Sequence, residues 1–148
     1  MSTEELIFDL VTADELVEAI AIEEEGYPAD EAASLSSFQY RQSQAGELFL
    51  GVFLPDNTPA KSRRIIGYIC STLAKGDTLT HESMSNHTPG AASDARRTNK
   101  AVYERVLLIA HEPLIPLYQK AGFELVGKSS VHHGSLPWFE MVYPLSSD

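Results

Sequence analysis

The segment over residues 106–126, VLLIAHEPLIPLYQKAGFELV, constrains the fold of this chain most strongly. Its opening residues, 106–110, form a continuous apolar run, which predicts a strand buried on both faces. Pro113 and Pro116 predict the first turn of a helix, where proline is tolerated, and Gly122 predicts its end. The apolar side of that helix is expected to comprise Leu114, Leu117, Tyr118 and Ala121. Phe123, Leu125 and Val126 are expected to open a second strand.

A strand followed at once by a helix and another strand predicts an α/β sheet. Ligands of such sheets bind at the carboxyl ends of strands. His111, Glu112 and Tyr118 follow the apolar strand directly. The sequence therefore predicts that a functional site lies near these three residues.

Hydrophobic periodicity predicts further elements along the chain. Alternation over residues 6–10 predicts a first strand, and Thr12 with Glu15 predicts a capping box before a helix. The apolar stripe of that helix is expected to comprise Leu16, Val17, Ala19 and Ile20. A second helix is predicted over about residues 30–44, with weaker periodicity. Its buried residues are expected to be Leu35 and Phe38.

The middle and the end of the chain predict strands. Residues 48–54 and 65–73 are expected to form an antiparallel hairpin. The segment between them, PDNTPAKSRR, is rich in turn residues and predicts a long basic loop. Residues 138–143 alternate and predict a final strand that Pro144 ends.

Composition limits the class of protein. The 148 residues, 43% of them hydrophobic, predict one domain over residues 1–148. The single cysteine, Cys70, excludes an intramolecular disulfide, and no apolar run approaches the length of a membrane span. The first ten residues lack the basic and apolar regions of a signal peptide. These features predict a cytoplasmic protein that does not associate with membranes.

The net charge of -10 is unevenly spread, because the first forty residues contain no Lys or Arg. Nucleic acid is not expected as a partner, since binding phosphates requires a basic face. Glu23, Glu24 and Glu25 precede a Gly-Tyr-Pro turn and Asp30 and Glu31 follow it, so that acidic side chains there would attract ammonium substrates. The alternative is that these charges form a solvated helix face.

Cys70 lies within the apolar run GYICSTL, which favours a small core residue over a nucleophile. A cysteine hydrolase built from Cys70 and His111 is an alternative that requires spatial evidence. The five histidines show no HxxxH or HExxH spacing, and no CxxC occurs. We therefore expect no metal site.

Four further stretches, together with residues 106–126, resemble the GCN5-related N-acetyltransferases (GNATs), and within them the arylalkylamine type. They are GYPADEAA over residues 26–33, AGELFLGVF over 45–53, THESMS over 80–85 and GSLPWFEM over 134–141. Their order and spacing agree with the family except in one place, so the resemblance covers most of the chain. It implies an α/β fold with a mixed, mostly antiparallel sheet flanked by helices.

The exception lies between the THESMS stretch and the apolar strand. Family members carry there another strand, an Arg/Gln-x-x-Gly-x-Gly/Ala loop and a helix, and the loop presents N–H groups to the pyrophosphate of acetyl-CoA. Here only residues 86–100, NHTPGAASDARRTNK, occupy the interval, with one glycine and no long apolar run. The resemblance therefore implies that the central strand, the phosphate loop and the following helix are absent. Residues 86–100 are expected to form a weakly ordered linker.

The resemblance also implies roles for particular residues. Tyr118 matches the family's tyrosine acid, because a phenol with a pKa near 10 stays protonated and can protonate a leaving thiolate. The family's histidine bases lie on the absent strand, so His111 is the nearest remaining candidate base, with a structural role in the turn as the favoured alternative. The cosubstrate acetyl-CoA is expected at Ala110, His111 and Glu112. The amine is expected at Glu25, Tyr27, Pro28, Asp30, Glu31, Phe38 and Trp138.

Two functions follow from the resemblance. The first is an acetyl-CoA-dependent N-acetyltransferase acting on a small primary amine, either an arylalkylamine or a polyamine. The second is a shortened, non-catalytic family member that binds an amine or a protein. In both cases the loss of a central strand is expected to split the sheet and expose edges, through which a homodimer could form.

Overall fold

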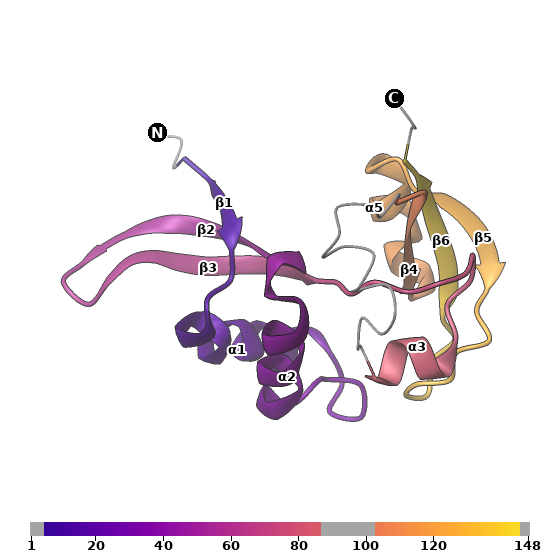
Figure 1. Ribbon diagram of the computed structural model, residues 1–148, viewed down its shortest axis with the longest axis horizontal. Helices are drawn as coiled ribbons and strands as arrows, with labels where there is room; N and C mark the ends of the chain where they lie inside the picture. Colours follow the sequence, from indigo (N-terminus) through magenta and orange to yellow (C-terminus); the bar gives the residue numbers. More distant parts are fainter. Residues whose placement is uncertain (1–4, 87–102, 146–148) are drawn as a thin grey trace. The chain divides into compact units, whose positions relative to one another are not determined.

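The computed structural model describes residues 5–86 and 103–145 (Figure 1). The chain divides into two compact units, Met1–Thr72 and Leu73–Asp148. Apart from Asn86, the predicted linker over residues 86–100 lies outside the described residues. The prediction of a single domain over residues 1–148 stays a prediction.

The first unit contains an antiparallel sheet with the strand order β1-β2-β3. Its elements are β1 (Ile7–Leu10), a 3-10 turn (Ala13–Glu15), α1 (Leu16–Gly26), α2 (Leu35–Ala45), a second 3-10 turn (Gly46–Leu48), β2 (Phe49–Thr58) and β3 (Lys61–Cys70). The capping box is present, and the Thr12 amide donates to the Glu15 carboxylate at 2.8 Å. The first strand, both helices and the hairpin are therefore confirmed.

The long basic loop predicted between the hairpin strands is wrong. Both strands continue through it, and Thr58 at the end of β2 pairs with Lys61 at the start of β3. Pro55, which has no amide hydrogen, lies at a shift in the ladder register. Turn-forming residues thus occur inside these strands as well as between them.

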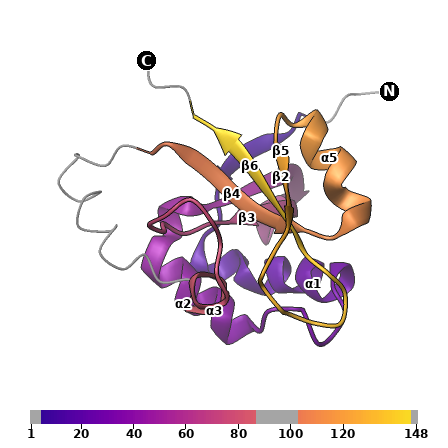
Figure 2. The ribbon, with the colours of Figure 1, turned by 90° about the vertical axis from the view of Figure 1, so that its right-hand side faces the viewer.

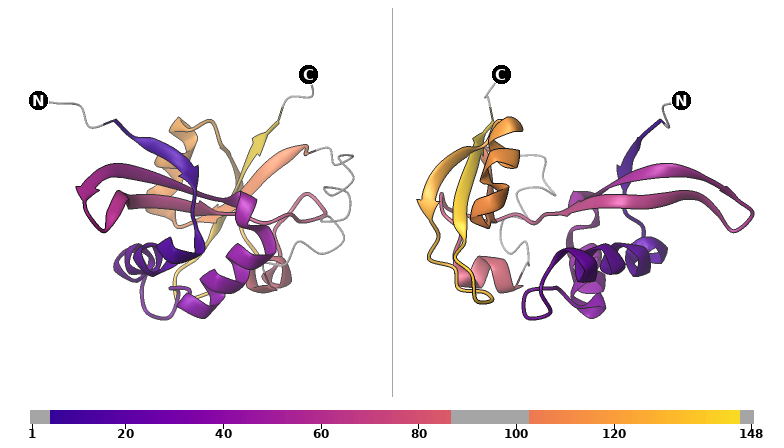
Figure 3. Two further views of the ribbon diagram at one scale, coloured as in Figure 1. Left: turned by 60° about the vertical axis from the view of Figure 1, so that its left-hand side comes forward. Right: turned by 180° about the vertical axis from the view of Figure 1, so that it is seen from behind.

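Helices α1 and α2 cover one face of this sheet (Figures 1 and 3). Phe38 from α2 is fully buried against Phe49 from β2, with ring centroids 5.5 Å apart. Helix α2 begins five residues later than predicted because the Ser34 side chain accepts the Ser37 amide at 3.2 Å and caps it there. Val17 is 64% exposed, so its predicted place in the apolar stripe of α1 is wrong.

The buried stripe of α1 follows the helical period. It consists of Leu16, Ala19, Ile20 and Glu23. These positions, i, i+3, i+4 and i+7, share one side of a helix, whereas position i+1 is turned about 100° away. An acidic residue therefore occupies a position where the period calls for an apolar one.

The opposite face of the sheet is apolar and exposed. Leu10, Leu50 and Ile69 pair directly across the three strands and are 41%, 48% and 65% exposed. Phe8, on the same face of β1, is 77% exposed. A sheet normally buries an apolar face against another layer, so this face is a candidate for binding.

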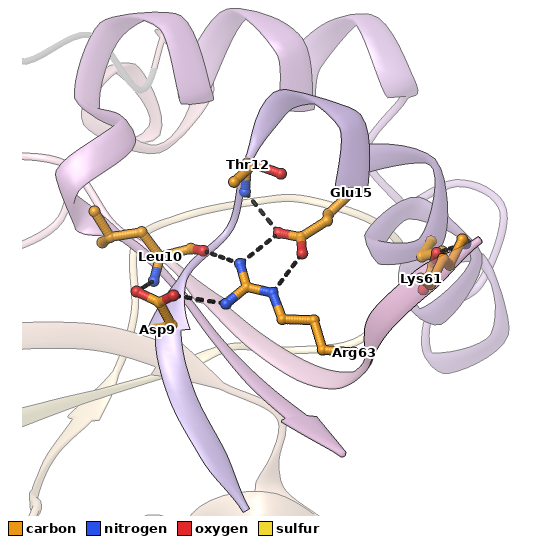
Figure 4. Close-up of polar contacts among 7 residues, drawn as sticks. Asp9, Leu10, Thr12, Glu15, Lys61 and Arg63 are labelled. Atoms are coloured by element: carbon orange, nitrogen blue, oxygen red, sulfur yellow. Dashed lines mark hydrogen bonds and ion pairs between the residues drawn. The ribbon is translucent and has the colours of Figure 1, made fainter. Parts of the chain in front are cut away.

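Arg63 ties the hairpin to the chain between β1 and α1 (Figure 4). Its guanidinium donates to both Glu15 carboxylate oxygens, at 2.6 and 3.0 Å, and to Asp9 at 2.6 Å. It also donates to the Leu10 carbonyl oxygen at 3.1 Å and lies 4.0 Å from the centroid of the Phe53 ring. The hydrogen bond from Arg63 lowers the pKa of Asp9. Partial burial raises the pKa of Glu15, but its hydrogen bonds outweigh that effect and lower it overall.

The second unit contains an antiparallel sheet with the order β4-β6-β5. Its elements are α3 (His81–Asn86), β4 (Arg105–Ala110), a 3-10 turn (Glu112–Leu114), α5 (Ile115–Lys120), β5 (Glu124–Lys128) and β6 (Phe139–Pro144). Helix α5 lies against one face of the sheet (Figure 2). The predicted strand, helix and strand over residues 106–126 are therefore confirmed, as is the final strand.

Two details of the second unit differ from the sequence prediction. Strand β4 is not buried on both faces, because Ala110 is its one fully buried residue. In α5 the buried residue is Ile115, whereas Leu114 and Leu117 are exposed. The 3-10 turn that precedes α5 has three residues per turn and changes the phase of the pattern. Tyr118, three residues after Ile115, stays on the core side.

The described strands form two three-stranded sheets, which confirms the mixed, mostly antiparallel α/β fold flanked by helices. The predicted loss of a central strand falls on residues outside the described part of the chain and stays a prediction. Among the described strands β3 pairs only with β2, and β4 only with β6. Both therefore present an edge of main-chain groups. No helix in the described part of the chain is long and apolar enough to cross a membrane.

Candidate functional site

Tyr118 lies in the last turn of α5 and is half-buried. Its ring packs edge-on against Phe123, with centroids 5.8 Å apart, and borders the core around Met141. No described residue forms a hydrogen bond with its hydroxyl. The ring is thus held by packing while the phenol is available to a ligand.

The end of α5 keeps the Tyr118 ring in place. Gly122 adopts a left-handed conformation, with φ of +97°, and ends the helix as predicted. The Phe123 amide donates to the Tyr118 carbonyl at 3.0 Å. A side chain at Gly122 would approach the Tyr143 ring to 2.8 Å. This turn therefore accepts only glycine without rearrangement.

His111 and Trp138 lie together in the second unit. Their rings stack with centroids 3.8 Å apart, and His111 Nδ1 donates to the Pro137 carbonyl at 3.0 Å. The Trp138 indole donates to the His133 carbonyl at 2.7 Å, and the side chain is buried. These contacts fasten the loop before β6 to the end of β4. They favour the structural role for His111, and its role as a base stays a prediction.

The residues expected at acetyl-CoA follow one another at the end of β4. Ala110 is buried, so only its main chain could contact a ligand. His111 is half-buried, and Glu112 is exposed at the start of the 3-10 turn. Main-chain groups of β4 along its outer edge could bind an amide-containing ligand.

The residues expected at the amine fall into two groups. The exposed group comprises Glu25 in the last turn of α1, and Tyr27, Pro28 and Asp30 on the connection between α1 and α2. Glu31 is buried in the same connection, and its amide donates to the Pro28 carbonyl at 2.9 Å. Phe38 is 1% exposed within the core, so its ring is covered by protein side chains. The exposed group is the part of this set that can meet a ligand.

A buried polar cluster behind that connection was missed from the sequence. Glu23 accepts the Ala33 amide at 2.9 Å and a short hydrogen bond from the Tyr68 hydroxyl. Burial, followed by the interaction with Glu23, raises the pKa of Tyr68. The available signal was the position of Glu23, seven residues after Leu16 on the buried stripe of α1.

A second buried carboxylate was also missed. Glu140 on β6 accepts the Leu79 amide at 3.2 Å and the Thr78 hydroxyl at 2.8 Å. It holds the segment before α3 against the second sheet. The available signal was spacing, because Glu140 lies two residues after Trp138 in the predicted final strand and such residues share one face.

The nucleophile and metal alternatives gain no support. Burial raises the pKa of Cys70 to about 11, so little thiolate exists at neutral pH. Cys70 and His111 belong to different units. No group of three or more His, Cys, Asp or Glu side chains that could hold a metal ion occurs among the described residues.

Comparison with solved structures identifies the fold. The chain superimposes on the NatC complex bound to Gag peptide and CoA with a TM-score of 0.64 and 13% identity, covering 96% of this chain and 99% of that one. It matches Ard1 from Thermoplasma volcanium with a TM-score of 0.62 and 12% identity, covering 96% and 99%. The chain has the GNAT acetyltransferase fold. The GNAT-like fold that the resemblance implies is therefore confirmed.

Sequence comparison gives one result that agrees with this fold, a match to a curated acetyltransferase. No family model matches the chain. The GNAT-like chain is 27% identical to serotonin N-acetyltransferase from Mesocricetus auratus over 120 residues, covering 64% of this chain and 55% of that relative. It thus spans about half the length of the curated relative that it matches.

Proposed function

We propose that this chain is an acetyl-CoA-dependent N-acetyltransferase that acts on a small primary amine. The observation that supports the proposal most directly is Tyr118, whose hydroxyl has no partner among the described residues and lies on the helix after β4 in a GNAT fold. A structure with this fold, the NatC complex, was solved bound to CoA. We assign Tyr118 as the general acid.

The proposed chemistry is acyl transfer from a thioester. The neutral amine nitrogen attacks the carbonyl carbon of acetyl-CoA, a C–N bond forms and the C–S bond breaks. The departing thiolate takes the proton of the Tyr118 hydroxyl, which solvent then restores, while the nitrogen loses a proton to water or to His111. The thioester end of the cosubstrate would lie near residues 110–112, with the outer edge of β4 offering main-chain hydrogen bonds to its amides.

The acceptor is a small amine drawn to the exposed residues at the end of α1 and on the α1–α2 connection. Glu25 and Asp30 would attract an ammonium group, and Tyr27, which is 39% exposed, offers an aromatic surface. The serotonin N-acetyltransferase relative favours an arylalkylamine over a polyamine. The burial of Phe38 and Trp138 leaves Tyr27 as the aromatic residue of the predicted set with most exposed surface.

An acetylation assay with tryptamine, a polyamine and acetyl-CoA tests the proposal. We expect turnover of the aromatic amine, and we expect Tyr118→Phe to slow it at least about 100-fold, the scale of a general acid. Tyr103→Phe is the matched control, because Tyr103 is an exposed tyrosine of the same unit. No turnover by the unaltered chain, or an equal rate in Tyr118→Phe, would contradict the assignment.

A second candidate is the non-catalytic binding module, favoured by the exposed row of Leu10, Leu50 and Ile69. In this reading a second copy of the chain packs on that face and on the open edge of β3. Sedimentation velocity should then show a dimer that Ile69→Lys dissociates and Val17→Lys, an exposed apolar site on α1, does not. A monomer at high micromolar concentration would exclude this reading.

A further inference from the structure

The connection between α1 and α2 carries four of the residues expected at the amine, Tyr27, Pro28, Asp30 and Glu31, and the Glu23 side chain contacts it from its buried side. Glu23 lies near the end of α1 and is 8% exposed. One carboxylate oxygen accepts the Ala33 amide at 2.9 Å, ten residues along the chain. The other accepts a short hydrogen bond from the Tyr68 hydroxyl on β3. Glu23 thus joins both ends of the connection to the sheet.

The environments of Glu23 and Tyr68 both favour this hydrogen bond. A buried carboxylate is costly unless its oxygens are hydrogen-bonded, and each oxygen of Glu23 has one such donor. The raised pKa of Tyr68 keeps its hydroxyl protonated and able to donate. The Tyr68 ring is itself fixed, because it meets the Phe38 ring at 5.3 Å in an edge-on contact. The sheet, the carboxylate and the Ala33 amide therefore form one chain of contacts.

Other contacts also hold the connection, since Glu31 is buried and the Tyr27 amide donates to the Glu23 carbonyl oxygen at 3.0 Å. The amides of Glu31 and Ala32 both donate to the Pro28 carbonyl, which shapes a turn without attaching it to the rest of the unit. Ser34 caps α2 at its far end. The hydrogen bond from the Ala33 amide to Glu23 joins the end of this turn to α1 and, through Tyr68, to β3.

We infer that Glu23 is a positioning residue that sets the acceptor affinity of the enzyme by holding the turn over residues 27–33 in place. The inference rests on the proposed function. Glu23 does not contact the amine, since it is buried and both its oxygens accept hydrogen bonds from the protein. It acts through Tyr27 and Asp30, which the turn presents to solvent.

Glu23→Gln, Tyr68→Phe and the control Glu24→Gln test this role. Glu24 is the exposed neighbour of Glu23 on α1 and loses the same charge. Amide hydrogen exchange, followed by NMR, measures the tether without any activity. We expect exchange at Ala33 to rise about tenfold or more in Glu23→Gln, which replaces the charged acceptor by a neutral amide with a single oxygen, and less in Tyr68→Phe. Glu24→Gln should leave it unchanged.

Steady-state kinetics measure the consequence. In Glu23→Gln the KM for tryptamine should rise about tenfold while the KM for acetyl-CoA stays unchanged. An equal rise in both KM values would mean a general loss of structure. Unchanged exchange at Ala33 would show that Glu23 does not hold the turn. Either result overturns the inference. If the unaltered chain acetylates no amine, the proposed function and the affinity role both fail, while exchange at Ala33 still decides whether Glu23 holds the turn.

Discussion

Replacement of Arg63 by alanine should destabilise the first unit by about 2–3 kcal/mol. The two hydrogen bonds to Glu15 are charge-assisted, and a bond of that kind contributes about 1.5–3 kcal/mol. The Arg63 and Glu15 side chains are each about one-fifth exposed, so solvent screening places the contribution of the pair at the low end of that energy range. The contact with the Phe53 ring adds about 0.5–1 kcal/mol.

Urea unfolding followed by circular dichroism measures this effect, with Arg64→Ala as the control. Arg64 is the next residue of β3 and is exposed. Its loss should change the free energy of unfolding by no more than about 0.5 kcal/mol.

The effect of Arg63→Ala should also depend on pH. Asp9 and Glu15 have folded pKa values below their reference values of 3.8 and 4.5. Groups whose folded pKa is depressed stabilise the fold above the unfolded pKa, and that contribution is lost as the pH falls through the folded pKa. The difference between the unaltered chain and Arg63→Ala should therefore be constant near pH 7 and shrink below about pH 4.5. A difference under 1 kcal/mol at pH 7, or one that grows on acidification, would refute this account.

Three further predictions concern single residues. Cys70 should react slowly with a disulfide reagent at pH 8 and quickly in urea, because its pKa of about 11 results from burial; equal rates would contradict this. Gly122→Ala should lower the free energy of unfolding by more than 1 kcal/mol, measured by urea melts, because of the positive φ and the nearby Tyr143 ring. Phe38→Ala should cost about 3–5 kcal/mol of stability, and a loss of amine affinity without a loss of stability would contradict its place in the core.

Local patterns predicted the elements of this fold well. The capping box of Thr12 and Glu15, the turn at Gly122 and the apolar run before His111 are determined by residues close together in the chain. Such signals depend on helix capping, glycine conformation and strand burial, which act over a few residues. They were enough to predict the mixed, mostly antiparallel fold.

Features that depend on distant residues were predicted less well. Glu23 was grouped with its acidic neighbours, because its partner Tyr68 lies 45 residues away. Phe38 was expected both in the core and at the amine, and periodicity alone could not choose between these places. The predicted hairpin loop was too long, because Asp56, Asn57 and Thr58 are turn-forming residues that here lie within β2.

The candidate site also depends on residues that are far apart in the chain. Tyr118, His111 and Trp138 belong to the second unit, whereas the acidic turn that is expected to receive the amine belongs to the first. The sequence could assign each residue to an element by pattern and resemblance. The partner of each side chain, such as the Trp138 ring against His111, is a tertiary contact that no pattern encodes.

Calorimetric titration of the full chain with acetyl-CoA tests the central claim, that this GNAT fold is a working acetyltransferase, most directly. The account predicts saturable binding, with heat released on addition of acetyl-CoA and a clear stoichiometry of one molecule per chain. The titration should extend to millimolar acetyl-CoA, because the resemblance predicts that the pyrophosphate loop is absent and that binding is therefore weak. No detectable heat of binding at that concentration would contradict the enzyme assignment and leave the binding module as the function of this chain.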